Sequence, residues 1–411
     1  MVLLGYERFF DALLIGRGRV SGEPGAPQVD LVNVTPTPPA QNTANEPQSE
    51  NEDFTLYFPE AGDEPLPDPI DIPPLSSLAR YTPGLNLELP IRGATGWAGA
   101  RIGLFRSNPL FDDGPPLRYL SPGQMFVILI EEGQTWFVEL PNGERGWVRH
   151  EACFINLPDV IPSLVFRNTN ASGSIKISGN YEIPGVTGVS LYRARSGNER
   201  FRLGQDEQMY IVPALYATAI RLFHVQQTAL ENGDTLVIYE VFRPHATQQL
   251  VVDQLNDLMR VNPNVRTALN TYPWSPTWFI SQGVSSHQRG AAVDASLARV
   301  VSYNIVDTAD FMYFYRRITE YVMHPMPTRV HDLHPSAAAF TGPRSTTLTG
   351  TMTDSAILLQ SYFTRYGFSP LASEWWHFND TRGVDLASGL YITGRFNTES
   401  VMSFPPYLRI E

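Results

Sequence analysis

Three short segments in the second half of the chain carry the side chains best suited to chemistry. Residues 285–294 read SSHQRGAAVD, residues 373–378 read SEWWHF, and residues 240–244 read EVFRP at the end of a predicted strand. Together they offer imidazoles, carboxylates and a guanidinium. Such a set of donors is typical of a site that binds a metal ion and hydrolyses a polar bond.

In the first segment, His287 and Asp294 stand seven positions apart. Zinc ligands place their donor atoms about 2 Å from the ion, whereas a straight strand would separate these residues by roughly 23 Å, at about 3.3 Å per residue. They can share a metal only if the chain folds back between them, and Gly290 has the permissive backbone for such a turn. The alternative is a surface turn with an incidental histidine and aspartate.

The second segment supplies a third candidate ligand, His377, with Glu374 three positions before it. Two histidines and an aspartate leave the fourth tetrahedral position of zinc to water, whose pKa then falls towards about 7. A carboxylate outside the ligand set, such as Glu374, can take the proton of that water and deliver it to a leaving amine. The alternative is a core strand in which His377 is a satisfied partner. The neighbouring aromatic residues Trp375, Trp376 and Phe378 are expected in the core in either case.

The third segment offers Arg243 as a fixed cation. An oxyanion develops in the tetrahedral intermediate of peptide hydrolysis, and a guanidinium stabilises it with a planar fork of donors that never deprotonates at working pH. Considered alone, Arg243 could equally be a surface arginine at the end of a strand.

The combination resembles the zinc D-alanyl-D-alanine dipeptidases (VanX-type) of the D-Ala-D-Ala metallopeptidase family. That family carries S-x-H-x(6)-D, then E-x-W-H, and an upstream Y-R-P-like arginine; the resemblance covers about residues 205–397. It implies a zinc enzyme in which Ser285 belongs to the substrate pocket. The other implied roles are His287, Asp294 and His377 as zinc ligands, Glu374 as catalytic base and Arg243 as stabiliser of the transition state.

The chain departs from the dipeptidases between the two metal segments. Where they carry D-M-G-T-x-F-D, which helps to hold the free amino terminus of a dipeptide, residues 325–332 read PMPTRVHD, and residues 332–353 resemble an insertion. A D,D- or L,D-carboxypeptidase or endopeptidase acting on peptidoglycan stem peptides is therefore a second interpretation. An inactive wall-peptide-binding protein is a third, although it would have no need for Glu374. The nearby histidines His324, His331 and His334 could form a second metal site. However, prolines directly follow His324 and His334, which favours an ordered loop instead.

The pattern of elements predicts an α+β fold. The predicted catalytic domain spans 205–411, and the resemblance implies that its fold is hedgehog/DD-peptidase-like. Within it, we expect helices at 206–227, 244–259, 308–323 and 353–366. We expect strands at 235–242, 291–297 and 374–378. Pro213 suggests that the first helix starts there or is kinked.

A small all-β barrel is predicted before it, at residues 98–157. Strands at 126–130, 135–140 and from 146 are separated by a Pro-Asn-Gly turn. The motif around Trp136 and Trp147 resembles bacterial SH3-like domains, in which these tryptophans would be core residues and the module could contact the cell wall. Residues 158–204 read as a turn-rich connector.

Composition excludes other chemistries. The 411 residues include one lysine, Lys176, and one cysteine, Cys153, which argues against an internal disulfide, a thiolate zinc site, a P-loop and a Schiff base. Cys153 is expected as a buried small hydrophobe. The net charge is −12, of which −11 belongs to residues 20–79, leaving −1 for the rest. No basic stripe suited to nucleic acid is visible.

The N-terminal region reads as non-globular. Residues 20–89 contain 13 prolines among polar and acidic residues, which predicts a disordered acidic linker. Residues 1–19 form a stub whose charged residues Glu7, Arg8 and Asp11 interrupt the apolar run of a signal peptide. No apolar stretch approaches a transmembrane span. We expect a bacterial enzyme of cell-wall metabolism in the envelope or outside the cell, with a cytoplasmic location as the alternative.

Overall fold

The computed structural model describes residues 65–72, 92–112, 114–167, 175–177, 181–183, 194–198, 203–307 and 314–395. All of them belong to one compact unit, Pro59–Glu411. The predicted stub at 1–19 and the predicted linker at 20–89, apart from residues 65–72, lie outside the described residues. None of the described helices is long and apolar enough to cross a membrane.

The first of the two large sheets is antiparallel and has the strand order β13-β7-β1-β4-β5-β6. Its strands are β1 (Thr95–Ala98), β4 (Met125–Glu132), β5 (Thr135–Glu139), β6 (Arg145–Arg149), β7 (Cys153–Asn156) and β13 (Pro213–Leu215). A two-stranded sheet joins β2 (Ile102–Leu104) to β3 (Arg118–Leu120). The strands expected around 126–148 are confirmed. Trp136 and Cys153 are fully buried, as expected, but Trp147, which was also expected in the core, is half-buried. The kinship with SH3-like domains stays a prediction.

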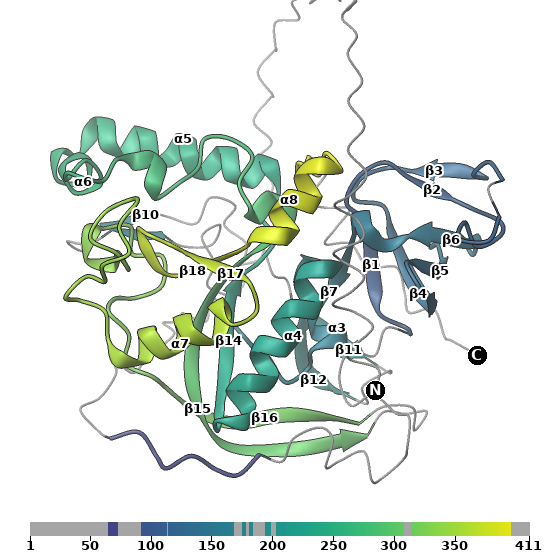
Figure 1. Ribbon diagram of the computed structural model, residues 1–411, viewed down its shortest axis with the longest axis horizontal. Coiled ribbons are helices and arrows are strands. Elements are labelled where there is room, and N and C mark those ends of the chain that lie inside the picture. The colour runs from purple at the N-terminus through teal and green to yellow at the C-terminus, as the bar shows by residue number, and fades with distance from the viewer. Residues whose placement is uncertain are drawn as a thin grey trace, which may run out of the picture. The chain divides into compact units, whose positions relative to one another are not determined.

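The second large sheet carries the candidate site and has the order β17-β18-β15-β14-β8, with β16 beside β15. Its strands are β8 (Val165–Phe166), β14 (Asp234–Glu240), β15 (Ala292–Asp307), β16 (Phe314–Met323), β17 (Phe368–Leu371) and β18 (Glu374–Asp380). Helices α4 (Tyr216–Glu231) and α7 (Asp354–Thr364) pack on it and on each other (Figure 1). The remaining long helices are α5 (His245–Val261), α6 (Pro263–Leu269) and α8 (Thr381–Gly389).

Most elements predicted for this region are confirmed, one predicted helix is right only in its second half, and another is wrong. The predicted helix at 206–227 is β12 (Leu203–Tyr210), paired with β11 (Ala194–Asn198), then β13, and helix begins only at Tyr216. Pro213 cannot supply the backbone N–H that a helix interior needs. The extended segments pair instead, β12 with the neighbouring β11 and β13 with the distant β7.

The predicted helix at 308–323 is wrong, because β16 occupies Phe314–Met323, while residues 308–313 lie outside the described residues. The segment FYRRITEYVM is rich in aromatic and β-branched residues, which suit a pleated strand. The partner strand β15 is much longer than predicted, so it offers a template along which β16 pairs.

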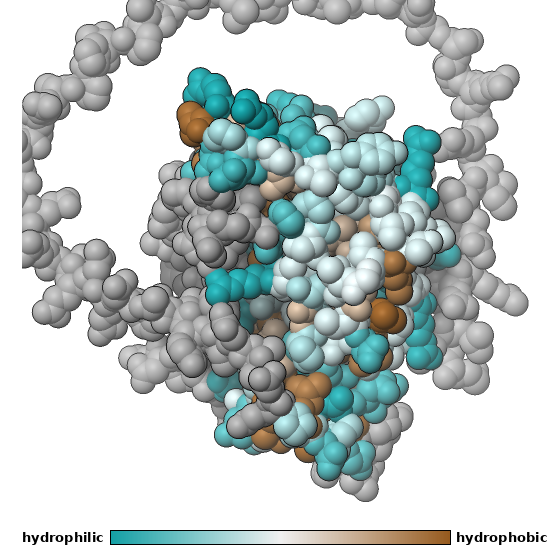
Figure 2. Space-filling view, turned by 90° about the vertical axis from the view of Figure 1, so that its left-hand side faces the viewer, coloured by the Kyte–Doolittle hydropathy of each residue, from teal (hydrophilic) through white to brown (hydrophobic). Residues whose placement is uncertain are grey.

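One continuous hydrophobic core joins the two large sheets. Strand β13 pairs with β7 of the first sheet and runs directly into α4, which packs on β14 of the second. The rings of Phe154 in β7 and Phe242, just after β14, lie 5.1 Å apart. The first sheet therefore packs directly against the segment that bears the predicted site residue Arg243. On the left-hand face of the molecule, hydrophobic side chains occur in small groups among hydrophilic ones (Figure 2).

Gly290 is the tightest point of this junction. It ends the short 3-10 helix His287–Arg289 in the left-handed conformation, with φ of 63°. A Cβ atom there would lie 2.6 Å from Cε1 of Phe154 and 2.8 Å from the backbone nitrogen of Leu215, which donates a hydrogen bond to the Gly290 carbonyl. Both the backbone conformation and the space therefore require glycine.

The substitution Gly290→Ala is expected to lower the free energy of unfolding by about 2 kcal/mol, because the methyl group adds overpacking to a left-handed backbone. Urea denaturation measures the change. The matched control is Gly350→Ala, since a Cβ at Gly350 meets no atom within 4 Å. Equal stability of the two variants would contradict this account of Gly290.

Candidate metal centre

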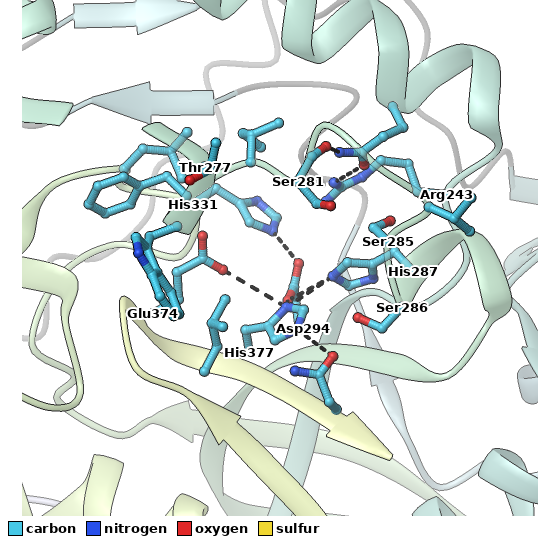
Figure 3. Close-up of a pocket in the computed structure, with 18 residues that line it drawn as sticks. Arg243, Thr277, Ser281, Ser285, Ser286, His287, Asp294, His331, Glu374 and His377 are labelled. Carbon is cyan, nitrogen blue, oxygen red and sulfur yellow. Dashed lines mark hydrogen bonds and ion pairs between the residues drawn. The ribbon is translucent and has the colours of Figure 1, made fainter. Parts of the chain in front are cut away.

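The predicted site residues come together in one pocket of about 280 Å³ (Figure 3). Strand pairing explains why. In the antiparallel register, Asp294 of β15 lies opposite His377 of β18 on one side and Glu240 of β14 on the other. Directly opposed residues project to the same face of a sheet. Three chemically active side chains therefore form a row across three strands.

The donor atoms of His287, Asp294 and His377 meet at one point. Oδ1 of Asp294 lies 3.0 Å from Nδ1 of His377 and 3.3 Å from Nε2 of His287, and these two nitrogens are 3.1 Å apart. All three residues are buried. The predicted turn between His287 and Asp294 exists: the short helix and Gly290 fold the chain back so that both reach the same place.

In His287 and His377, the ring nitrogen that faces away from Asp294 is hydrogen-bonded, and this bond fixes the position of the ring proton. Nδ1 of His287 donates to the carbonyl oxygen of Val241 at 2.8 Å, and Nε2 of His377 donates to Oδ1 of Asn379 at 3.0 Å. Each ring therefore turns a lone pair toward Asp294. Fixing a ligating histidine through its other nitrogen is the usual arrangement of metal sites.

The charges of the cluster reinforce one another. Burial acts to raise the pKa of Asp294, but the three histidines around it hold that pKa well below its ordinary value. Burial acts to lower the pKa of His377, but the hydrogen bond and charge of Asp294 outweigh it and raise that pKa. Three converging acceptors need a positive charge between them, supplied by a shared proton or a metal cation. Nitrogen and carboxylate donors in this number suit zinc.

Glu374 lies beside this cluster without belonging to it. Its Oε2 is 3.9 Å from Nδ1 of His377, and its side chain lines the pocket. Burial raises the pKa of Glu374 to about 8, with the charge of Asp294 acting in the same direction and His377 opposing it. A carboxyl group with a raised pKa is well matched to accepting a proton near neutral pH.

Arg243 lines the opposite part of the pocket in a fixed orientation. Its Nε and Nη2 donate to the two carboxylate oxygens of Glu240 at 2.9 and 2.5 Å, and its Nη1 donates to Oε1 of Gln248 at 2.7 Å. Glu240 and Gln248 are both buried. Gln248 is in turn held by the carbonyl of Ser281, to which its amide donates at 2.7 Å. Neither Glu240 nor Gln248 was among the predicted site residues.

Ser285 also lines the pocket, as the resemblance implies. Its backbone N–H donates to Oε1 of Gln288 at 2.6 Å, and its hydroxyl accepts from the backbone N–H of Gln288 at 3.3 Å. These reciprocal bonds hold the turn that carries His287.

The structure adds a third imidazole, which the sequence interpretation placed in an ordered loop. His331 lines the pocket, and its Nε2 lies 3.1 Å from Oδ2 of Asp294. The donors of Glu240, Asp294 and His331 are also close enough to hold a metal. Both oxygens of Glu240 are already bound by Arg243, however, so the positive charge at that point is supplied by the guanidinium.

The other two histidines of that loop lie elsewhere. His324 binds Asp234 and Ser355, and His334 accepts from the backbone N–H of Ser336 at the start of a short helix. They form no metal site with His331. The departure of residues 325–332 from the family pattern pointed to this segment, but only the fold shows which of its histidines reaches the pocket.

Residues 184–388 match the family model of peptidase M15, described as D-Ala-D-Ala dipeptidase. No protein with a curated description matches the chain. The matched range starts before the predicted boundary at 205 and contains every predicted site residue. The match implies a metallopeptidase, and the converging histidines and aspartate could hold its metal.

Replacing Asp294 by Asn is expected to weaken zinc binding by at least about 100-fold, because the change removes the only anionic donor of the set. Isothermal titration calorimetry of the metal-free protein measures it. The control is Asp257→Asn, a change at an exposed carboxylate that binds Arg260. Unchanged zinc affinity in Asp294→Asn would rule out this centre.

Proposed function

We propose that the chain is a zinc peptidase that hydrolyses the bond between two D-alanines in cell-wall metabolism. The observation that carries the proposal is the convergence of three lone pairs from His287, Asp294 and His377 beside a buried carboxyl group that is no part of the cluster. The family match supports the substrate class.

In this proposal His287, Asp294 and His377 hold the zinc ion. When bound there, zinc acts as a Lewis acid that lowers the pKa of water towards about 7 and polarises the scissile carbonyl. The second nitrogens of the two imidazoles, held by Val241 and Asn379, keep both lone pairs aimed at the ion. Zinc is preferred because the donors are nitrogen and oxygen in a small set.

Glu374 takes the proton of the attacking water. It then delivers this proton to the amine nitrogen of the leaving D-alanine as the carbon–nitrogen bond breaks. Its burial supports both steps, because a raised pKa lets the carboxyl group hold a proton long enough to pass it on.

Arg243 stabilises the oxyanion that develops on the carbonyl oxygen. The two-point pairing with Glu240 and the bond to Gln248 hold the guanidinium in place before substrate arrives. A preorganised donor needs little rearrangement during the reaction, which is the main condition for this kind of stabilisation.

The shape of the pocket fits a short substrate with small side chains. Ser281, Ser285 and Ser286 line the pocket together with apolar residues such as Phe279 and Leu333. Hydroxyl donors suit a terminal carboxylate, and the apolar wall suits alanine methyl groups. An envelope or extracellular location would bring the protein to such peptides.

An inactive binding protein is the competing proposal, and Glu374→Gln separates the two. The amide keeps the shape but cannot accept a proton, so kcat is expected to fall about 1000-fold while zinc content stays the same. Mass spectrometry of the products from peptides ending in D-Ala-D-Ala measures the rate. Hydrolysis by the variant at the wild-type rate would exclude Glu374 as the base, and no hydrolysis by wild-type protein would favour the binding protein.

Replacing Arg243 by Lys tests the oxyanion role. Lysine keeps a positive charge but loses the planar fork that grips Glu240, so kcat is expected to fall about 100-fold with little change in KM. The exposed Arg260→Lys is the matched control, since its carboxylate partner lies on the surface. A variant with an unchanged kcat would show that Arg243 serves only structure.

A further inference from the structure

His331 holds an unusual position in the pocket. It is one of two non-glycine residues with positive φ among the described residues, at 65°, and it is 4 % exposed. Its ring stands edge-on to Trp376 and Tyr239, at centroid distances of 6.0 and 6.3 Å. The left-handed conformation costs a residue with a side chain about 1 kcal/mol, and such strain gathers at functional sites.

One nitrogen of this ring is available to a ligand. Oδ2 of Asp294 can only accept, so in the neutral imidazole the hydrogen lies on Nε2 of His331, and Nδ1 is the acceptor. Nδ1 has no hydrogen-bond partner among the described residues, and the ring lines the pocket (Figure 3). His287 and His377, in contrast, use both of their ring nitrogens.

The pocket offers no carboxylate to pair with a free amino terminus. The carboxylates among the described residues that line it are Asp294 and Glu374. Asp294 is bound by three imidazoles, and Glu374 is needed for the proton of the water. An ammonium group taken out of water without an anionic partner is strongly destabilised, whereas an amide N–H needs only a neutral acceptor.

We propose that His331 is a specificity-determining residue whose Nδ1 accepts a hydrogen bond from a peptide N–H of the substrate. The site then takes D-Ala-D-Ala at the end of an N-acylated peptide in preference to the free dipeptide. This inference rests on the proposed function, because it names the form of the same substrate.

The test compares two substrates of the zinc-loaded full chain: free D-Ala-D-Ala and Nα-acetyl-L-Lys-D-Ala-D-Ala. We expect wild-type kcat/KM to be at least about tenfold higher for the acylated peptide, because one good hydrogen bond in a desolvated site changes affinity by about that factor. His331→Ala is expected to lower kcat/KM for the acylated peptide about tenfold and for the dipeptide less than about twofold. A purely structural role through Asp294 would lower both alike.

Two further variants sharpen the test. His331→Asp places a carboxylate where an ammonium could pair with it, so the preference should move toward the free dipeptide by about tenfold or more. His334→Ala, in the same loop but outside the pocket lining, should leave the preference unchanged. Zinc content is measured for each variant, so that loss of metal is distinguished from a change of specificity.

The outcomes separate the two proposals. If wild-type protein hydrolyses the free dipeptide as well as or better than the acylated peptide, the inference about His331 is overturned and the proposed function stands. Equal losses on both substrates in His331→Ala, with zinc retained, overturn it as well. If neither substrate is hydrolysed, the proposed function itself fails.

Discussion

The antiparallel register of β14, β15 and β18 is the constraint on which the site depends. It sets Glu240, Asp294 and His377 opposite one another, so that three side chains from distant parts of the sequence share one face of the sheet. A shift by one residue would turn each of these side chains to the other face. All seven residues of β14 and six of the seven of β18 are buried, so this row of polar side chains lies away from water.

Asp294 is the centre of this row because it joins two parts of the pocket. One oxygen faces His287 and His377, and the other faces His331. On the neighbouring strand, Glu240 is neutralised by Arg243, which leaves the guanidinium fixed at the pocket wall. Each buried charge therefore has a partner, as burial away from water requires, and each pair also orients a group that the proposed chemistry uses.

The first large sheet contributes to the site without supplying a reactive group. Phe154 packs against both Phe242 and the Gly290 turn, and Leu215 donates a hydrogen bond to that turn. Phe242 directly precedes Arg243 in the chain, and the Gly290 turn directly follows the short helix that bears His287. This contact therefore supports both site residues. A sheet predicted as a separate module is thus continuous with the core of the region that matches peptidase M15.

The motifs and the family resemblance singled out His287, Asp294 and His377, whose donor atoms the structure brings together. They also identified the turn at Gly290 and the strands that bear Asp294 and His377. Strand β16 and the extended segment before α4 were predicted as helices, since their extended conformation is stabilised by pairing with other strands, which helical periodicity does not reveal: β16 with the preceding β15, β12 with the preceding β11, and β13 with the distant β7. Glu240 and Gln248 lie within five residues of Arg243, but only the tertiary structure shows that they hold its guanidinium in place. His331 reaches Asp294 from a separate segment, and no local pattern in the sequence predicts that contact.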